Sequence, residues 1–98
     1  MSTVRLLIAN ETGLHARPAA LFAQTAQQFQ ATLLLRHSGR RVDAKNVLNI
    51  LGLNVCQGAE VTLEAEGPDA EAAVQALQEL VTANFEVTRF EAKEGENE

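Results

Sequence analysis

The stretch Gly13-Leu14-His15-Ala16-Arg17-Pro18-Ala19-Ala20 sets a histidine at a tight turn, directly before a helix. Gly13 can take the positive φ that a sharp approach to a helix often needs. Pro18 fits the first helical turn, where a missing N–H costs nothing. The pattern therefore predicts a helix that begins at about His15 to Arg17.

The start of this helix is a favourable place for an anion. Backbone N–H groups in a first turn have no internal acceptor, and the helix dipole adds a partial positive charge there. The imidazole of His15 can be nucleophilic near neutral pH, and a phosphohistidine would leave its oxygens within reach of those donors. Arg17 can supply a charge-assisted fork to the same oxygens. A lone histidine near a helix start is more often a cap or a surface residue, so that interpretation remains open here.

The composition indicates one small acidic domain. The chain has 98 residues and a formal net charge of −5. This length is enough for a single core without disulfides or metal but too short for a second catalytic domain. The acidic balance argues against nucleic acid as the main partner and suits a soluble cytoplasmic protein. We see no signal peptide, and no apolar run approaches the roughly 20 residues that span a membrane, so we expect no direct membrane insertion.

The pattern of apolar residues predicts an element order of βαββαβα. Strands are expected at residues 4–9, 31–36, about 40–43 and 60–66. Helices are expected at about residues 16–28, from the cap Asn46 to a stop at Leu51 or Gly52, and after Gly67-Pro68-Asp69. The last strand alternates apolar residues (Val61, Leu63 and Ala65) with polar ones (Glu60, Thr62, Glu64 and Glu66), so one of its faces should be exposed to solvent.

These elements predict an α+β fold, an open-faced β-sandwich with a four-stranded, mainly antiparallel sheet and three helices on one face. Residues 1–88 should form this domain. Residues 89–98 form a polar, acidic C-terminal tail that we expect to be disordered.

The octapeptide at residues 13–20 resembles the active-site signature of the histidine-containing phosphocarrier proteins (HPr) of the bacterial phosphoenolpyruvate-dependent sugar phosphotransferase system. It matches that signature at every position, and the likeness extends over roughly residues 2–85. The resemblance implies a phosphocarrier rather than an enzyme, without a cofactor, with His15 phosphorylated at Nδ1. Arg17 would neutralise the phosphoryl oxygens, and the N–H groups of Ala16 and Arg17 would face them. The implied donor is Enzyme I, and the implied acceptors are IIA domains of sugar permeases.

The short helix after Asn46 carries more apolar surface than one buried side requires, so part of it should be exposed. The alternative is a helix wedged in place and buried on two sides. In HPr proteins the corresponding face, with part of the first helix, docks the donor and the acceptors. The resemblance thus implies a partner-binding role for Ala20, Gln24, Gln27, Val47, Leu48, Asn49 and Leu51.

One departure from the family pattern concerns Asn46, which stands where many HPr proteins carry a regulatory serine. Asparagine can cap a helix but has no hydroxyl to phosphorylate, which weakens the case for control by an HPr kinase and a catabolite-control repressor. The alternative functions are a carrier in a nitrogen-linked or dihydroxyacetone-kinase phosphorelay, a non-catalytic HPr-like co-regulator, and a ferredoxin-like binding module in which His15 only caps a helix.

Other candidate sites are weaker. His37 lies among arginines beside a predicted hairpin turn, where solvated charges are the usual finding and no aromatics accompany them. A metal site from His15, His37 and Cys56 lacks ligand spacing, and the glutamates of residues 60–66 do not form a catalytic pair. Cys56 is the only cysteine, so no intramolecular disulfide can form, and we expect it to be a buried or half-buried apolar residue.

Overall fold

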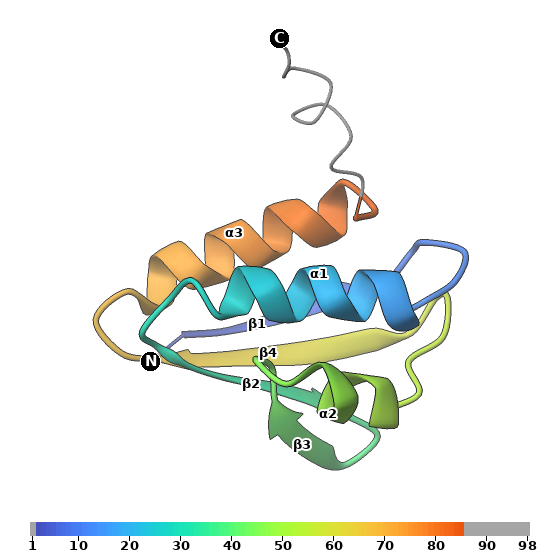
Figure 1. The fold of residues 1–98 in the computed structure, drawn as a ribbon, viewed down its shortest axis with the longest axis horizontal. Helices are drawn as coiled ribbons and strands as arrows, with labels where there is room; N and C mark the ends of the chain where they lie inside the picture. Colours follow the sequence, from blue (N-terminus) through green and yellow to red (C-terminus); the bar gives the residue numbers. More distant parts are fainter. Residues whose placement is uncertain (1, 86–98) are drawn as a thin grey trace, which may run out of the picture.

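The computed structural model describes residues 2–85 and confirms the predicted order of elements (Figure 1). The predicted tail at residues 89–98, and the end of the predicted domain at residue 88, lie outside the described residues. Within residues 2–85, no helix is long and apolar enough to cross a membrane. The strands are β1 (Ser2–Leu7), β2 (Thr32–His37), β3 (Arg40–Asp43) and β4 (Glu60–Glu66), and the helices are α1 (Ala16–Ala26), α2 (Val47–Gly52) and α3 (Ala70–Thr82).

The four strands form one sheet in the order β1-β4-β2-β3, and each neighbouring pair is antiparallel. Strand β4 therefore lies between β1 and β2, and its Leu63 pairs with Val4 on one side and Leu35 on the other. Helices α1 and α3 cross one face of this sheet, while α2 packs beside α1 and near β3 (Figure 1). The open-faced α+β sandwich is thus confirmed.

The core lies between the sheet and its helices. On β4 the predicted alternation is confirmed, because Val61, Leu63 and Ala65 are all buried. Phe22 from α1 and Leu77 from α3 are fully buried in the same cluster. Removing a side chain of this size from water contributes about 1.5–3 kcal/mol, so these apolar stripes fix how the helices lie on the sheet.

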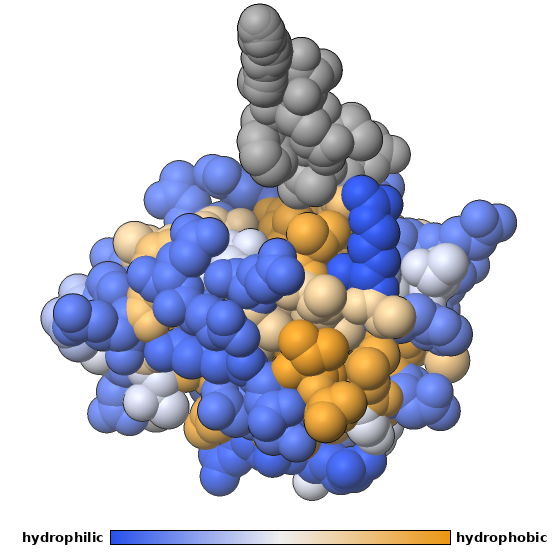
Figure 2. Space-filling view, viewed as in Figure 1, coloured by the Kyte–Doolittle hydropathy of each residue, from blue (hydrophilic) through white to orange (hydrophobic). Residues whose placement is uncertain are grey.

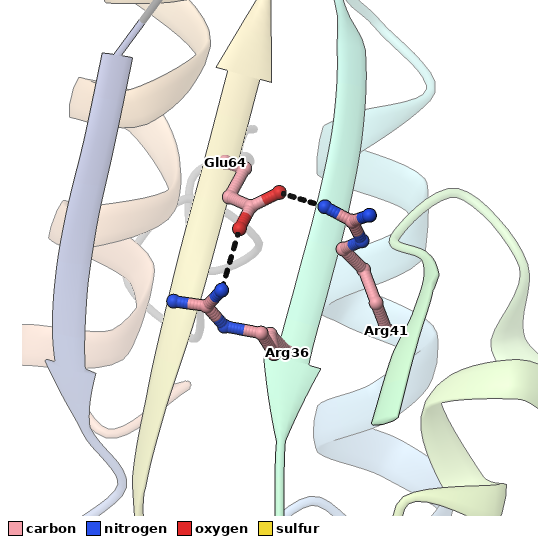
Figure 3. A network of polar contacts seen from close by, with 3 residues as sticks. All are labelled: Arg36, Arg41 and Glu64. Carbon is pink, nitrogen blue, oxygen red and sulfur yellow. Dashed lines mark hydrogen bonds and ion pairs between the residues drawn. The ribbon is translucent and has the colours of Figure 1, made fainter. Parts of the chain in front are cut away.

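The opposite face of the sheet holds an ion-pair network rather than only solvated charges (Figure 3). The side chain of Glu64 is 14% exposed and lies 3.3 Å from Nη1 of Arg36 and 3.2 Å from Nη1 of Arg41. The prediction that Glu64 is exposed, like Glu60 and Glu66, is therefore wrong. The register explains the difference, because Arg36 pairs directly with Arg41 and lies next to the β4 row of Glu64. Glu60 and Glu66 are exposed as expected.

Several predicted boundaries move by one or two residues. Strand β1 starts at Ser2, because its pairing with β4 extends from the Ser2 row to the Leu7 row. Helix α1 ends at Ala26 instead of Gln28, since the chain then tightens, with the N–H of Gln28 donating to the carbonyl of Thr25 at 3.1 Å. Strand β2 runs one residue later than expected at both ends.

The two ends of α2 differ in how well the sequence predicts them. Asn46 caps the helix as expected, and its side chain accepts a hydrogen bond from the N–H of Asn49 at 3.1 Å. The predicted glycine stop is wrong, because Gly52 is still helical and the C-cap is Leu53. The left-handed residue that follows is Asn54, with φ +56°. Asparagine tolerates this region better than most residues, so it can end a helix in place of glycine.

A carboxylate ties the start of α3 to the chain before β2. Asp69 accepts hydrogen bonds from the N–H of Gln30 at 2.9 Å and from that of Ala31 at 2.8 Å. The Gln30 N–H, aided by that of Ala31, holds the pKa of the Asp69 carboxyl below its ordinary value, although partial desolvation acts the other way. Glu71 lies in the first turn of α3, where a negative charge complements the helix dipole, as predicted.

Candidate functional site

His15 is the N-cap residue of α1, as the octapeptide predicts. Its backbone is extended, with φ −83° and ψ −165°, and its carbonyl accepts the first helical hydrogen bond, from the N–H of Ala19 at 2.8 Å. The imidazole is exposed and makes no capping hydrogen bond. The side chain is therefore accessible to a reaction partner, and the imidazole does not cap the helix through a hydrogen bond of its own.

The first turn of α1 supplies anion-binding groups beside His15. Ala16 and Arg17 are exposed, and their N–H groups lie in the turn where a helix has no internal acceptor. Pro18 is buried and lacks an N–H, so it leaves no further donor to satisfy. Within residues 2–85, the Arg17 guanidinium makes no ion pair or side-chain hydrogen bond, so nothing there opposes its use by a ligand.

The loop that delivers His15 is braced against the chain between α2 and β4. Gly13 has φ +63°, as its predicted role requires, and the N–H of Leu14 donates to the carbonyl of Val55 at 3.0 Å. The Leu14 side chain is buried in the core. An exposed His15 thus follows an anchored residue, which limits how far the imidazole can move with the backbone.

Asn10, which was not among the predicted site residues, closes the turn before His15. Its Nδ2 donates to the carbonyl of Gly13 at 2.7 Å, and the N–H of Gly13 donates back to the carbonyl of Asn10 at 3.1 Å. The available signal was the spacing, because asparagine is favoured at the first position of a tight turn and glycine at the fourth. A shallow hollow beside this turn extends past Arg17 to Asn84 and Phe85 at the end of α3.

An apolar surface lies close to α1 on helix α2. Leu48 is 77% exposed, while Val47 and Leu51 are half-buried and only Ile50 is fully buried. The alternative of a helix buried on two sides is therefore wrong. Figure 2 shows hydrophobic residues gathered over α2 and continuing toward the N-terminal part of α1, which packs against α2. Such a patch is typical of a protein-binding surface.

The remaining predicted partner-binding residues border this patch. Gln24 and Asn49 are exposed, and Ala20 is half-buried. Gln27 is also exposed, but its Nε2 donates to the carbonyl of Lys45 at 2.8 Å, so this amide also holds α1 to the segment before α2. We call the surface formed by Ala20, Gln24, Gln27, Val47, Leu48, Asn49 and Leu51, whose partner-binding role stays a prediction, the docking surface.

The weaker candidates do not form a second site. In the described part of the chain, no group of three or more His, Cys, Asp or Glu residues could hold a metal ion. His37 Nδ1 lies 3.4 Å from the carbonyl oxygen of Glu60, and Arg40 donates to the carbonyl of Gly52 at 2.7 Å. Cys56 is exposed, so the prediction of a buried or half-buried cysteine is wrong. It follows Val55 in the irregular segment that braces Gly13, outside the core-facing strands.

The comparisons point to one family of proteins. The family model described as the PTS HPr component phosphorylation site matches residues 3–83. The structure is similar to HPr-C-His from Thermoanaerobacter tengcongensis, with a TM-score of 0.85, 46% identity, and coverage of 87% of this chain and 96% of that one. It is also similar to HPr from Bacillus anthracis, with a TM-score of 0.79, 39% identity, and coverage of 82% and 95%.

A curated relative comes from a different phosphorylation system. It is the phosphoryl donor subunit DhaM of the PEP-dependent dihydroxyacetone kinase of Providencia stuartii, 45% identical over 83 residues. The match covers 85% of this chain but only 17% of DhaM, so the chain corresponds to one part of that larger protein.

Proposed function

The chain belongs to the HPr family of phosphocarrier proteins, and on this premise we propose that it accepts a phosphoryl group on His15 from Enzyme I and passes it to IIA domains of sugar permeases. The observation that carries the proposal is the position of His15, exposed at the N-cap of α1 with an imidazole that makes no capping hydrogen bond to the helix. A nucleophilic ring at a helix start combines a reactive atom with a ready anion site.

The transfer is a displacement at phosphorus. The Nδ1 atom of His15 attacks the phosphoryl group of the donor, so a P–N bond forms while the bond from phosphorus to the donor breaks. The N–H groups of Ala16 and Arg17 face the transferred oxygens, and the Arg17 guanidinium offsets their charge. The helix start contributes up to about 2 kcal/mol to holding the anion, which keeps the phosphoryl group bound loosely enough to be passed on.

The docking surface would receive both the donor and the acceptor. Its exposed apolar centre, Leu48, lies on α2, which packs against α1, the helix that His15 caps. A partner seated there would cover an apolar anchor and bring its own reactive group toward His15. One surface used in turn by two partners suits a carrier that must release each before it binds the next.

The test is phosphorylation of the purified chain with phosphoenolpyruvate and a catalytic amount of Enzyme I. We expect one acid-labile, base-stable phosphate per chain, absent in His15→Ala and retained in the matched control His37→Ala. His37 is half-buried beside the β2–β3 turn, and its Nδ1 lies near a backbone carbonyl oxygen. Phosphate on His37, or phosphate that persists in His15→Ala, would contradict the proposal.

A second candidate is a carrier in a dihydroxyacetone-kinase relay, which the 45% identity with part of DhaM favours. The chemistry at His15 would be the same, and only the acceptor would differ. The phosphorylated chain should be offered in parallel to a IIA domain of a sugar permease and to a dihydroxyacetone-kinase phosphorylation system. Faster transfer to the second would assign the chain to that relay and leave the role of His15 unchanged.

A further inference from the structure

We propose that Asn10 is a positioning residue for phosphoryl transfer, whose side-chain amide fixes the peptide group that leads to His15. The inference rests on the proposed carrier function of His15. The side chain of Asn10 does not need to contact the phosphoryl group. It acts through the backbone, by holding the carbonyl of Gly13.

The peptide group between Gly13 and Leu14 is held at both ends. Its carbonyl oxygen accepts a hydrogen bond from Asn10 Nδ2 at 2.7 Å, and its N–H donates to the carbonyl of Val55 at 3.0 Å. One partner, Asn10, lies in the loop after β1, and the other, Val55, lies in the segment between α2 and β4. The orientation of this peptide plane is therefore fixed, and with it the direction in which the chain continues to His15.

The side chain of Asn10 is not used as a turn-forming asparagine ordinarily is. In such a turn the side-chain oxygen accepts a hydrogen bond from the N–H two residues on. Here Oδ1 of Asn10 is buried and has no hydrogen-bond partner in the described part of the chain. A buried acceptor without a partner costs stability. The donor Nδ2 is thus the part of the side chain that the loop uses.

The position of His15 depends on this loop because, within residues 2–85, its own side chain makes no hydrogen bond to the start of α1. The imidazole is exposed and forms no capping hydrogen bond. When Nδ2 is removed, the Gly13 carbonyl loses its side-chain partner and the peptide plane can rotate. A misplacement of about 1 Å at a reacting group can lower a rate by about a hundredfold. Loss of the Asn10 hydrogen bond, which reaches His15 only through the backbone of residues 13 and 14, can therefore slow transfer strongly.

The experiment compares Asn10→Ser and Asn10→Ala with the control Gln57→Ala. Serine keeps the turn preference of position 10, but its hydroxyl is too short to reach the Gly13 carbonyl. Gln57 makes an equivalent bond nearby, from its Nε2 to the carbonyl of Ala9 at 3.2 Å, without touching the peptide before Leu14. For each chain, kcat and KM for transfer from phosphorylated Enzyme I are measured beside the urea midpoint of unfolding.

We expect both Asn10 variants to lower kcat about ten- to a hundredfold, with KM for the donor nearly unchanged because the docking surface is intact. Gln57→Ala should keep the wild-type kcat. A wild-type kcat in a folded Asn10→Ser chain would overturn the proposal, and so would an equal loss of kcat in Gln57→Ala, since that would show a general effect of loosening the loop.

Backbone amide NMR shifts of Asn10→Ser make the test independent of activity. In Asn10→Ser the amides of Leu14, His15 and Ala16 should shift, while those of α3 should not. Unchanged shifts at these three amides would contradict the positioning role even if transfer were slow. A wild-type chain that accepts no phosphate would contradict the proposed function instead, and the NMR result would still decide whether Asn10 sets the backbone at His15.

Discussion

Gly13 lies so close to Val55 that a Cβ at position 13 would overlap the Val55 carbonyl oxygen. The same Cβ would come within 2.9 Å of the Cα of Cys56. The contacting atoms belong to the backbone, so no side-chain rotation can relieve the overlap. The glycine that opens the octapeptide is therefore required by the packing of two distant segments as well as by its own φ of +63°.

Gly13→Ala should lower the free energy of unfolding by more than about 2 kcal/mol, because the left-handed conformation alone costs an alanine about 1–2 kcal/mol and the overlap adds to it. Gly39→Ala is the matched control. Gly39 has φ +80°, but nothing lies within 4 Å of its added Cβ, so only the conformational cost applies. Urea unfolding of both variants measures the difference, and equal losses would show that the Val55 contact can relax.

The local part of the site could be predicted from sequence, and the long-range part could not. Gly13, His15 and Pro18 carry their own signals for a turn and a helix start, since φ and the first-turn N–H groups depend on nearby residues. The brace from Val55 depends on how the segment before β4 folds back. No local pattern contains that information, so only the structure shows that Gly13 lies too close to the backbone of Cys56 to carry a side chain.

The docking surface shows the same division. The excess of apolar residues in α2 predicts that some are exposed, but packing against α1 decides that Leu48 is outward and Ile50 inward. Glu64 alternates like a surface residue, yet cross-strand neighbours from β2 and β3 half-bury it between two arginines. In both cases the periodicity of apolar residues predicts which face of the element is apolar. Tertiary contacts then determine how far each side chain is exposed.

Arg17→Ala should leave the fold nearly intact and slow phosphoryl transfer. A charge-assisted hydrogen bond contributes about 1.5–3 kcal/mol, which corresponds to a rate loss of about ten- to a hundredfold. Arg17→Lys should recover only part, because an ammonium cannot match the guanidinium fork. Arg5→Ala is the control for the change in charge, since Arg5 is exposed on β1 and pairs with Glu60 at 3.6 Å. Wild-type rates of transfer in both directions would make Arg17 only a surface charge.

Leu48→Asp should weaken binding to Enzyme I by at least about tenfold, because it replaces an exposed apolar anchor with a charge. Its melting temperature should change little, since the side chain is 77% exposed. Leu7→Asp makes the same substitution at the other large hydrophobic residue that is exposed within residues 2–85; it is 58% exposed and lies on β1, outside the docking surface. Isothermal titration with Enzyme I compares the two. Equal weakening by both variants would argue against α2 as the contact.

Asp69 should make folding stability depend on pH in the acid range. The folded-state pKa of its carboxyl is lowered, chiefly by the Gln30 N–H, so the unfolded chain takes up a proton first as the pH falls. The stabilisation is present above the unfolded pKa of about 4 and is lost as the pH falls below it. Asp69→Asn should flatten this part of the profile of urea midpoint against pH. Glu71→Gln, which removes the same charge two residues later, in the first turn of α3, should retain it.

Asn46 should make the chain a poor substrate for an HPr kinase, because its amide offers no nucleophilic hydroxyl at the start of α2. Ser38 cannot replace it, since it lies in the turn between β2 and β3 with φ +53°. The informative change is Asn46→Ser. Serine and asparagine cap helices about equally, so stability should shift by only a few tenths of a kcal/mol, whereas Asn46→Ala should lose about 1 kcal/mol with the bond to the Asn49 N–H.

Incubation with ATP and HPr kinase then separates capping from phosphorylation. Asn46→Ser should gain an acid-stable phosphate, and the wild type and Asn46→Ala should remain unmodified, because only serine supplies the hydroxyl while all three keep the neighbouring docking surface. Wild-type chains that are phosphorylated from ATP as readily as the serine variant would show that this protein retains serine control at another position. That result would leave the role of His15 untouched, because the two modifications use different atoms, different donors and different helix starts.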